Sequence, residues 1–171
     1  MEKNRNRLIY DDLSEFRESI EQKDYSIPVT EDLDPLGQSS EVGGKVIPNS
    51  LCLNPMEGHD ADADGGPSAL TFRRYRRYAE GGAGIIWVEA TAVSEKGKGH
   101  PRELILSEES LAGFAQLNRE IKKHARKFHG DGPGPLTVIQ LTHSGRHAAP
   151  EGRPAPIIPK HSDLLDKNYD I

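Results

Sequence analysis

The feature that most constrains the fold is an alternation of short apolar runs with longer amphipathic segments between residues 45 and 141. Two short runs lie within KVIPNSLCLNPM, starting at Lys45, and a Pro48–Asn49 turn separates them; the second, Leu51–Leu53, stops at Pro55. Later runs cover Gly84–Ala90 (GIIWVEA) and Leu136–Leu141 (LTVIQL). Each has the length of a strand. Because Gly84–Ala90 shows little alternation, we predict a strand covered on both faces, as in a parallel sheet.

Two helices are predicted between these strands. Apolar residues fall near helical spacing over Ser68–Glu80, and Gly81–Gly82 follows as a terminator. The second helix, Ser110–Phe128, carries apolar residues at i, i+3 and i+4 spacing: Leu111, Phe114, Leu117, Ile121 and Ala125. The order strand, helix, strand, helix, strand predicts an α/β fold, either an open doubly wound sheet or a closed barrel.

The flanking segments are more polar. We divide the chain into an arm over residues 1–44, a partial barrel or sheet domain over 45–150, and an incomplete loop segment over 151–171. The arm is expected to contain one short helix, around Leu13–Ile20. A complete (β/α)8 barrel needs about 250 residues. The 171 residues are therefore expected to hold only part of one.

Composition excludes several classes of function. The net charge of -5 argues against a non-specific nucleic-acid binder, which needs a clustered excess of Lys and Arg. Cys52 is the single cysteine, so neither an intrachain disulfide nor a CxxC redox pair can form, and we expect it in the core. The sequence has no apolar stretch typical of a signal peptide or membrane span. These observations predict a cytoplasmic protein.

Charged clusters offer alternative sites. The arginines of the first main helix could bind phosphate, but an outward, solvated face is the favoured interpretation. The segment Asp60–Gly65 reproduces the first half of a calcium loop, yet Thr71 stands where the bidentate Glu is required. A solvated acidic loop, with Ser68 or an Asp capping the helix, explains the same residues. A metal site at His143 and His147 is disfavoured, because no third ligand is evident.

In parallel α/β folds, ligands collect at the C-terminal ends of the strands. The positions of interest are therefore Asn54–Glu57, Glu89–Ala90 and Gln140–His143. Small residues there allow a planar ligand to approach, and the amide of Gln140 can both donate to and accept from a heteroaromatic edge. A strand-end amide that satisfies a neighbouring loop is the alternative for Gln140.

These segments also resemble a known family. NPM at 54–56, GGAGIIWVEATAVSEKGKG at 81–99 and QLTHSGRHA at 140–148 are similar, in order and spacing, to segments of the Old Yellow Enzyme family. The resemblance favours the barrel and implies an FMN-dependent oxidoreductase that takes hydride from NADH or NADPH and passes it to an activated alkene or related small molecule. It also implies a flavin site: Asn54, Pro55, Met56 and Glu57 along the flavin, Ala90 beside its ring and Gln140 at its pyrimidine edge.

Two residues depart from the family pattern. Glu57 stands where many relatives have Thr, Ser or Cys, and a carboxylate there would disfavour negative charge on the reduced flavin unless it were protonated or turned away. Ser50 stands where relatives often have Arg, a change expected to affect packing. His143 and Arg146 match the family motif, and structural roles are favoured for both.

Several expected parts of such an enzyme have no counterpart among the predicted strands. The family's substrate-contacting His or His/Asn pair follows the fourth strand, and the segments that hold the FMN phosphate come near the seventh and eighth. We therefore assign no catalytic residue, and expect weak flavin binding and association of the isolated chain through open sheet edges. The alternative functions are a non-catalytic binding or assembly module and, less favoured, a calcium-loop protein.

Overall fold

A computed structural model describes residues 10–168, and the chain divides into two compact units, Met1–Asp34 and Pro35–Ile171. In the first unit, helix α1 (Leu13–Gln22) begins where the side chain of Asp12 accepts a hydrogen bond from the Glu15 amide at 3.0 Å. The predicted helix around Leu13–Ile20 is thus confirmed. A single-turn helix, α2 (Asp34–Gly37), follows.

A short antiparallel hairpin precedes the main sheet. It joins β1 (Ser40–Val42) to β2 (Lys45–Ile47). Gly43 and Gly44 form the turn with φ of 57° and 76°, left-handed values that glycine adopts without steric cost. Strand β1 was not predicted, because an exposed three-residue strand gives no hydrophobic alternation strong enough to detect.

The main sheet is parallel throughout and centres on β4 (Ile85–Ala92). β4 pairs with β3 (Cys52–Leu53), β5 (Leu104–Ile105) and β6 (Leu136–Thr142). Helix α3 (Ala69–Glu80) connects β3 to β4, and α4 (Leu111–His129) precedes β6. The predicted order of strands and helices is therefore confirmed, with β5 as an addition. Three short 3-10 helices, Glu95–Gly97, Gly145–His147 and Asp166–Asn168, lie in the loops.

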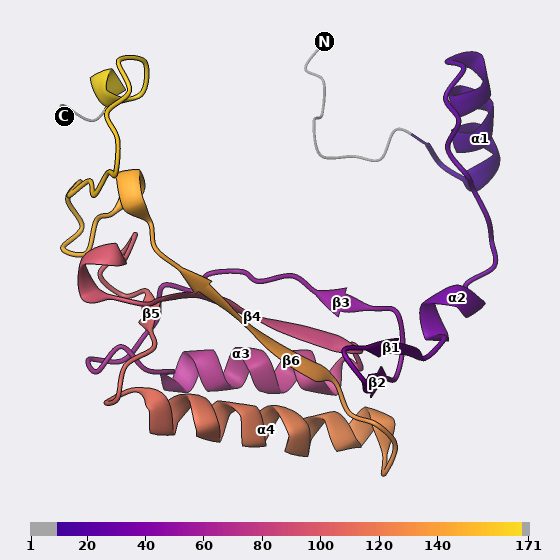
Figure 1. Ribbon diagram of the computed structural model, residues 1–171. Coiled ribbons are helices and arrows are strands. Elements are labelled where there is room, and N and C mark those ends of the chain that lie inside the picture. Colours follow the sequence, from indigo (N-terminus) through magenta and orange to yellow (C-terminus); the bar gives the residue numbers. More distant parts are fainter. Residues whose placement is uncertain (1–9, 169–171) are drawn as a thin grey trace. The chain divides into compact units, whose positions relative to one another are not determined.

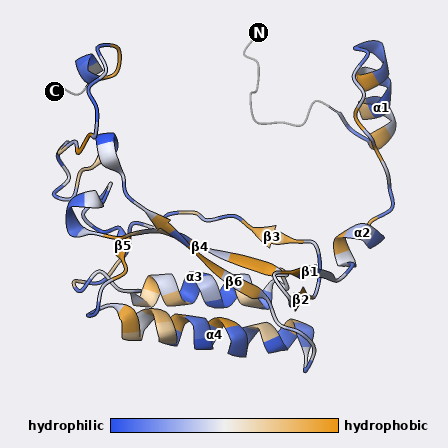
Figure 2. Cartoon of the chain, in the orientation of Figure 1, coloured by the Kyte–Doolittle hydropathy of each residue, from blue (hydrophilic) through white to orange (hydrophobic). Residues whose placement is uncertain are grey.

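Both long helices cover the same face of this sheet, as Figure 1 shows. Between them and the strands lies the apolar core, made of Tyr75, Ala79, Ile86, Val88, Leu117, Ile121 and Ala125. Figure 2 shows apolar residues on the strands and along the helix sides that face them. Burial of this one face supplies the main hydrophobic stabilisation of the second unit.

The opposite face of β4 is not covered by a helix within residues 10–168, and Trp87 is 39% exposed. The prediction that β4 is covered on both faces therefore holds for Val88–Ala92, which are all buried, but not for the first half of the strand, where Trp87 is exposed. A continuous apolar run reports that both faces suit burial, but not which element covers them. The parallel sheet with helices on one side forms part of a barrel wall and does not close.

Cys52 corrects a second expectation, since its side chain is exposed rather than in the core. Successive strand residues point to opposite faces, and the next residue, Leu53, is the one that packs against the core. In a two-residue strand, the sequence gives no alternation from which to assign the faces.

The ends of α3 agree with the sequence analysis. Ser68 is the N-cap and forms a capping box with Thr71. The helix stops at Gly81, followed by Gly82 with φ of 82°. None of the helices in the described residues is both long enough and apolar enough to cross a membrane.

Candidate functional site

The three predicted ligand-binding segments meet at the C-terminal end of the parallel sheet. Ala90 of β4 and Gln140 of β6 are directly paired in the strand register. The segment Asn54–Glu57 follows β3, which lies on the other side of β4. Just beyond it, the Gly58 amide donates a hydrogen bond to Oε2 of Glu89 at 2.6 Å, which fixes this loop against the end of β4.

The side chains at this end differ in exposure. Met56 is 66% exposed, whereas Ala90 is buried at 4%. Within residues 10–168, the side-chain amide of Gln140 makes no hydrogen bond to another residue, although it is half-buried. A free amide beside a small alanine fits the edge of a flat heteroaromatic ring, which needs a paired donor and acceptor and little steric bulk. The residues present therefore fit FMN at this place.

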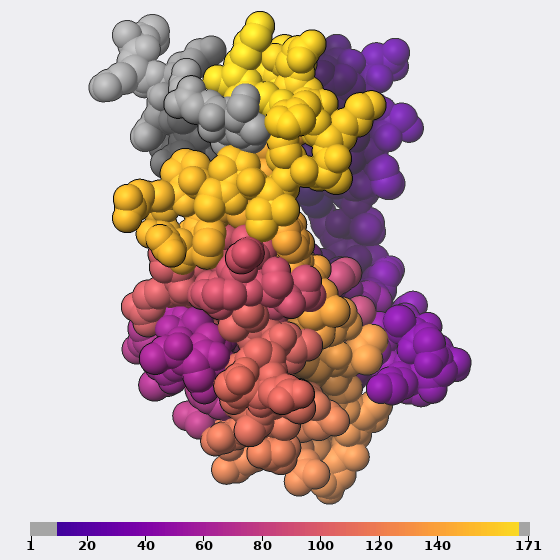
Figure 3. All heavy atoms as spheres, turned by 60° about the vertical axis from the view of Figure 1, so that its left-hand side comes forward, coloured from indigo at the N-terminus to yellow at the C-terminus, as the bar shows by residue number. Residues whose placement is uncertain are grey.

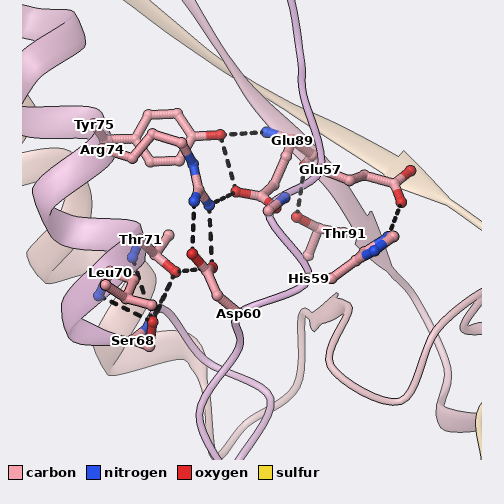
Figure 4. A network of polar contacts seen from close by, with 11 residues as sticks. Glu57, His59, Asp60, Ser68, Leu70, Thr71, Arg74, Tyr75, Glu89 and Thr91 are labelled. Atoms are coloured by element: carbon pink, nitrogen blue, oxygen red, sulfur yellow. Dashed lines mark hydrogen bonds and ion pairs between the residues drawn. The ribbon is translucent and has the colours of Figure 1, made fainter.

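A buried ionic network lies directly beneath the loop after β3 (Figure 4). Arg74 of α3 donates from Nη1 to Oδ2 of Asp60 at 2.6 Å and from Nη2 to Oε1 of Glu89 at 2.5 Å. Asp60 also accepts from the hydroxyl of Thr71 at 2.7 Å, and the Tyr75 hydroxyl accepts from the Glu89 amide at 2.7 Å. One cation thus joins two carboxylates from different segments of the chain.

Arg74 corrects the prediction of an outward, solvated arginine face. Its side chain is only 20% exposed, and the carboxylates of Asp60 and Glu89 are 9% and 2% exposed. Exposed Arg73 and Arg77 agree with the prediction, and half-exposed Arg76 pairs with Glu120 at 2.9 Å. A buried charge needs a partner, so the Glu near the end of the apolar run Gly84–Ala90 was the sequence signal for this network.

The pKa values in the network follow from burial and pairing. Burial raises the pKa of the Tyr75 hydroxyl, and the neighbouring charge of Glu89 raises it further. Burial opposes ionisation of Asp60, but the hydrogen bonds from Arg74 and Thr71 outweigh it and lower the pKa of that carboxyl. For Arg74, burial is likewise outweighed by Asp60 and Glu89, so its pKa is raised. The carboxylate of Asp60 and the guanidinium are therefore charged at neutral pH.

Glu57 is engaged by a histidine pair. Its Oε2 lies 2.7 Å from Nε2 of His59, whose ring stacks on that of His100 at a centroid distance of 4.1 Å. His59 adopts a left-handed φ of 47°. Nδ1 of His100 accepts a hydrogen bond from the Arg102 amide at 3.1 Å, while burial and the nearby His59 lower the pKa of His100. The Glu57 carboxylate is thus held beside an imidazole.

The acidic segment Asp60–Gly65 does not behave as a calcium loop. Asp60 is buried and committed to Arg74 and Thr71, whereas Asp62 and Asp64 are exposed. Asp64 accepts a hydrogen bond from the Gly66 amide at 2.9 Å, a local turn interaction. The solvated-loop interpretation therefore holds for Asp62 and Asp64 but is wrong for Asp60. Among the described residues, no group of three or more His, Cys, Asp or Glu side chains is placed to hold a metal ion.

The motif after β6 makes local structural contacts. Nδ1 of His143 accepts from the Gly145 amide at 3.0 Å. Arg146 forms an ion pair with Asp166, which also accepts from the Ser162 amide at 2.9 Å. Arg146 therefore fastens the segment around Asp166 to the end of β6.

The chain is similar in sequence and fold to parts of several known proteins. An NADPH dehydrogenase of Bacillus pumilus is 38% identical over 111 residues, which cover 64% of this chain and 30% of that protein. One of Halalkalibacterium halodurans is 32% identical over 134 residues, covering 77% of this chain and 36% of the relative. An Old Yellow Enzyme structure from Pichia sp. AKU4542 has a TM-score of 0.57 at 18% identity, over 67% of this chain and 28% of that one.

Over the matched part of its length, the chain is similar to proteins of the Old Yellow Enzyme family. The resemblance seen in the sequence is thereby confirmed, and so is the fold, part of a (β/α)8 barrel. No family model matches the chain. It spans about a third of the length of the two NADPH dehydrogenases, at 30% and 36%.

Proposed function

We propose that this chain forms the first strands of an FMN-dependent oxidoreductase that takes hydride from NADH or NADPH and passes it to an activated alkene or a related small molecule. Relatives named NADPH dehydrogenase support the reaction class. The observation that carries the proposal is the pairing of Ala90 with Gln140 at the sheet end where the loop Asn54–Glu57 is anchored.

Each residue then has a role toward the cofactor. Backbone groups of Pro55 and Met56 would lie along the flavin, Ala90 would leave room beside its ring, and the Gln140 amide would bind its pyrimidine edge. When bound, FMN supplies the hydride acceptor and donor. Glu57, held by His59, would keep its carboxylate paired, which reduces its electrostatic effect on the flavin.

The proposal is tested by titrating FMN into the chain and following the quenching of flavin fluorescence. Gln140→Ala should weaken binding several-fold, because the ring edge loses a donor and an acceptor. Gln116→Ala, an exposed amide on α4, is the matched control and should leave the affinity unchanged. Equal affinities for Gln140→Ala and the unaltered chain would reject the assigned site.

Turnover by the chain alone is not part of the proposal. None of the site residues named above is a substrate-contacting His or His/Asn pair, so we expect FMN to bind weakly and NADPH oxidation by this chain to be undetectable. We also retain the cytoplasmic location and the absence of nucleic-acid partners, on the charge and hydropathy of the sequence.

A second candidate function is an assembly module. Strand β6 pairs with β4 on one side only among the described strands, and an apolar cleft of about 280 Å³ lies between α4 and β6. Figure 3 shows this side of the chain, where α4 runs beside β6. An open edge next to an apolar cleft favours pairing with another copy. Leu111 is exposed at this cleft, so Leu111→Lys should lower the apparent mass measured by light scattering. If the unaltered chain is a monomer, this candidate function is excluded.

A further inference from the structure

We infer that Arg74 and Glu89 are positioning residues that set the conformation of the loop Asn54–Asp60 and thereby shape the cofactor site. The inference rests on the proposed function, because it assigns a role to residues beneath the site rather than in it. Neither residue was among the predicted flavin contacts.

Glu89 lies next to two segments of the predicted flavin site. It directly precedes Ala90, and its carboxylate accepts the amide of Gly58, which directly follows Glu57. Strand register between β4 and β6 is irregular between Val88 and Ala90, so Glu89 sits at a bulge. A bulge re-aims a side chain, and here the side chain lies on the α3 side, where Arg74 and the Tyr75 hydroxyl donate to its carboxylate. One carboxylate therefore connects two segments of the predicted flavin site.

The guanidinium of Arg74 binds both carboxylates. Its two terminal nitrogens donate to the two carboxylate oxygens of Asp60, at 2.6 and 3.1 Å, and Nη2 also donates to Oε1 of Glu89 at 2.5 Å. Asp60 closes the loop that begins at Asn54, so the loop is fastened both at Gly58 and at Asp60. A planar guanidinium can hold two carboxylates in fixed directions, whereas an ammonium acts as a point charge. Orientation, and not charge alone, is what this position supplies.

The backbone at Gly58 lies very close to Arg74. A methyl group added at Gly58 would overlap the guanidinium of Arg74. Since that guanidinium is held by two buried carboxylates, it cannot move aside without lengthening its ion pairs. Glycine at position 58 thus allows the loop backbone to lie directly against Arg74. The close approach explains how a loop with exposed side chains at Met56 and Glu57 keeps a defined backbone.

The test measures loop protection and flavin affinity separately in the full 171-residue chain. Arg74→Lys keeps the charge but removes the fork, and Gly58→Ala keeps every charge but displaces the guanidinium. Arg76→Lys is the matched control, an arginine on the same helix that pairs with Glu120 at the surface. Circular dichroism checks that each variant is folded.

Both Arg74→Lys and Gly58→Ala should speed hydrogen exchange at the Gly58 amide at least tenfold and weaken FMN binding, with Arg76→Lys changing neither. Unchanged exchange in both variants overturns the anchoring. Faster exchange with unchanged FMN affinity overturns the positioning role alone. If the unaltered chain does not bind FMN, the proposed function and the cofactor role fail together, while exchange still decides whether the loop is anchored.

Discussion

Replacing Arg74 with Met should destabilise the chain far more than any other change to the arginines of α3. The substitution keeps an unbranched apolar stem but leaves the carboxylates of Asp60 and Glu89, 9% and 2% exposed, without their cation. Removing one partner of a buried pair costs about 3–5 kcal/mol. Because Arg74 is itself 20% exposed, we expect a value near the lower end, about 3 kcal/mol of unfolding free energy.

The matched change, Arg76→Met, removes an ion pair whose arginine is 42% exposed, so it should cost only about 0–1 kcal/mol. Urea unfolding at pH 7, followed by circular dichroism, measures both variants. The double change Arg74→Met with Glu89→Gln should recover part of the loss, since one unpaired charge is removed as well.

The same variants have a predictable pH dependence. The pKa of Asp60 is lowered in the folded chain, so its stabilising contribution is present above the unfolded value of 3.8 and is lost as the pH falls through the folded pKa. In Arg74→Met, the buried carboxyl without its cation takes up a proton more readily. The difference between the unaltered chain and Arg74→Met should therefore shrink from pH 7 to pH 4. Equal losses for Arg74→Met and Arg76→Met at pH 7 would refute this reasoning.

Three further measurements test other parts of the structure. Ser68→Ala removes the N-cap of α3 and should cost about 1 kcal/mol in urea unfolding, whereas Ser14→Ala, on exposed α1, should cost less. Ile121 of α4 is fully buried against the sheet, so Ile121→Ala should lower the free energy of unfolding by about 2–5 kcal/mol. A loss smaller than that of Ser68→Ala would contradict the core described above. The pKa of His100 is lowered in the folded chain, so the unfolded state binds more protons just below the ordinary value of 6.5. Stability should therefore rise as the pH is raised through that window, and His100→Gln should flatten the slope; an unchanged slope would show that other groups cause it.

Much of the fold was determined by local sequence patterns. The helical periodicity over Ser68–Glu80 and Ser110–Phe128 predicted α3 and α4, because one apolar stripe on each helix must be buried. Glycines and the Ser68 cap marked the helix ends, since only a few residue types satisfy the backbone there. The predicted flavin segments also meet at one sheet end, because parallel strands place their C-terminal ends together.

What the sequence left undetermined depends on partners distant along the chain. Which element packs opposite a side chain decides the exposure of Cys52 and Trp87 and the burial of Arg74. The type of residue does not determine which element packs there. Arg73, Arg74, Arg76 and Arg77 look equivalent as a charge cluster, yet only Arg74 lies where Asp60 and Glu89, 14 and 15 residues away, converge. The sequence by itself determined the elements and their order. Tertiary packing decided which charges are buried and which loop they hold, because electrostatic pairing in an apolar interior depends on distances that only the folded chain defines.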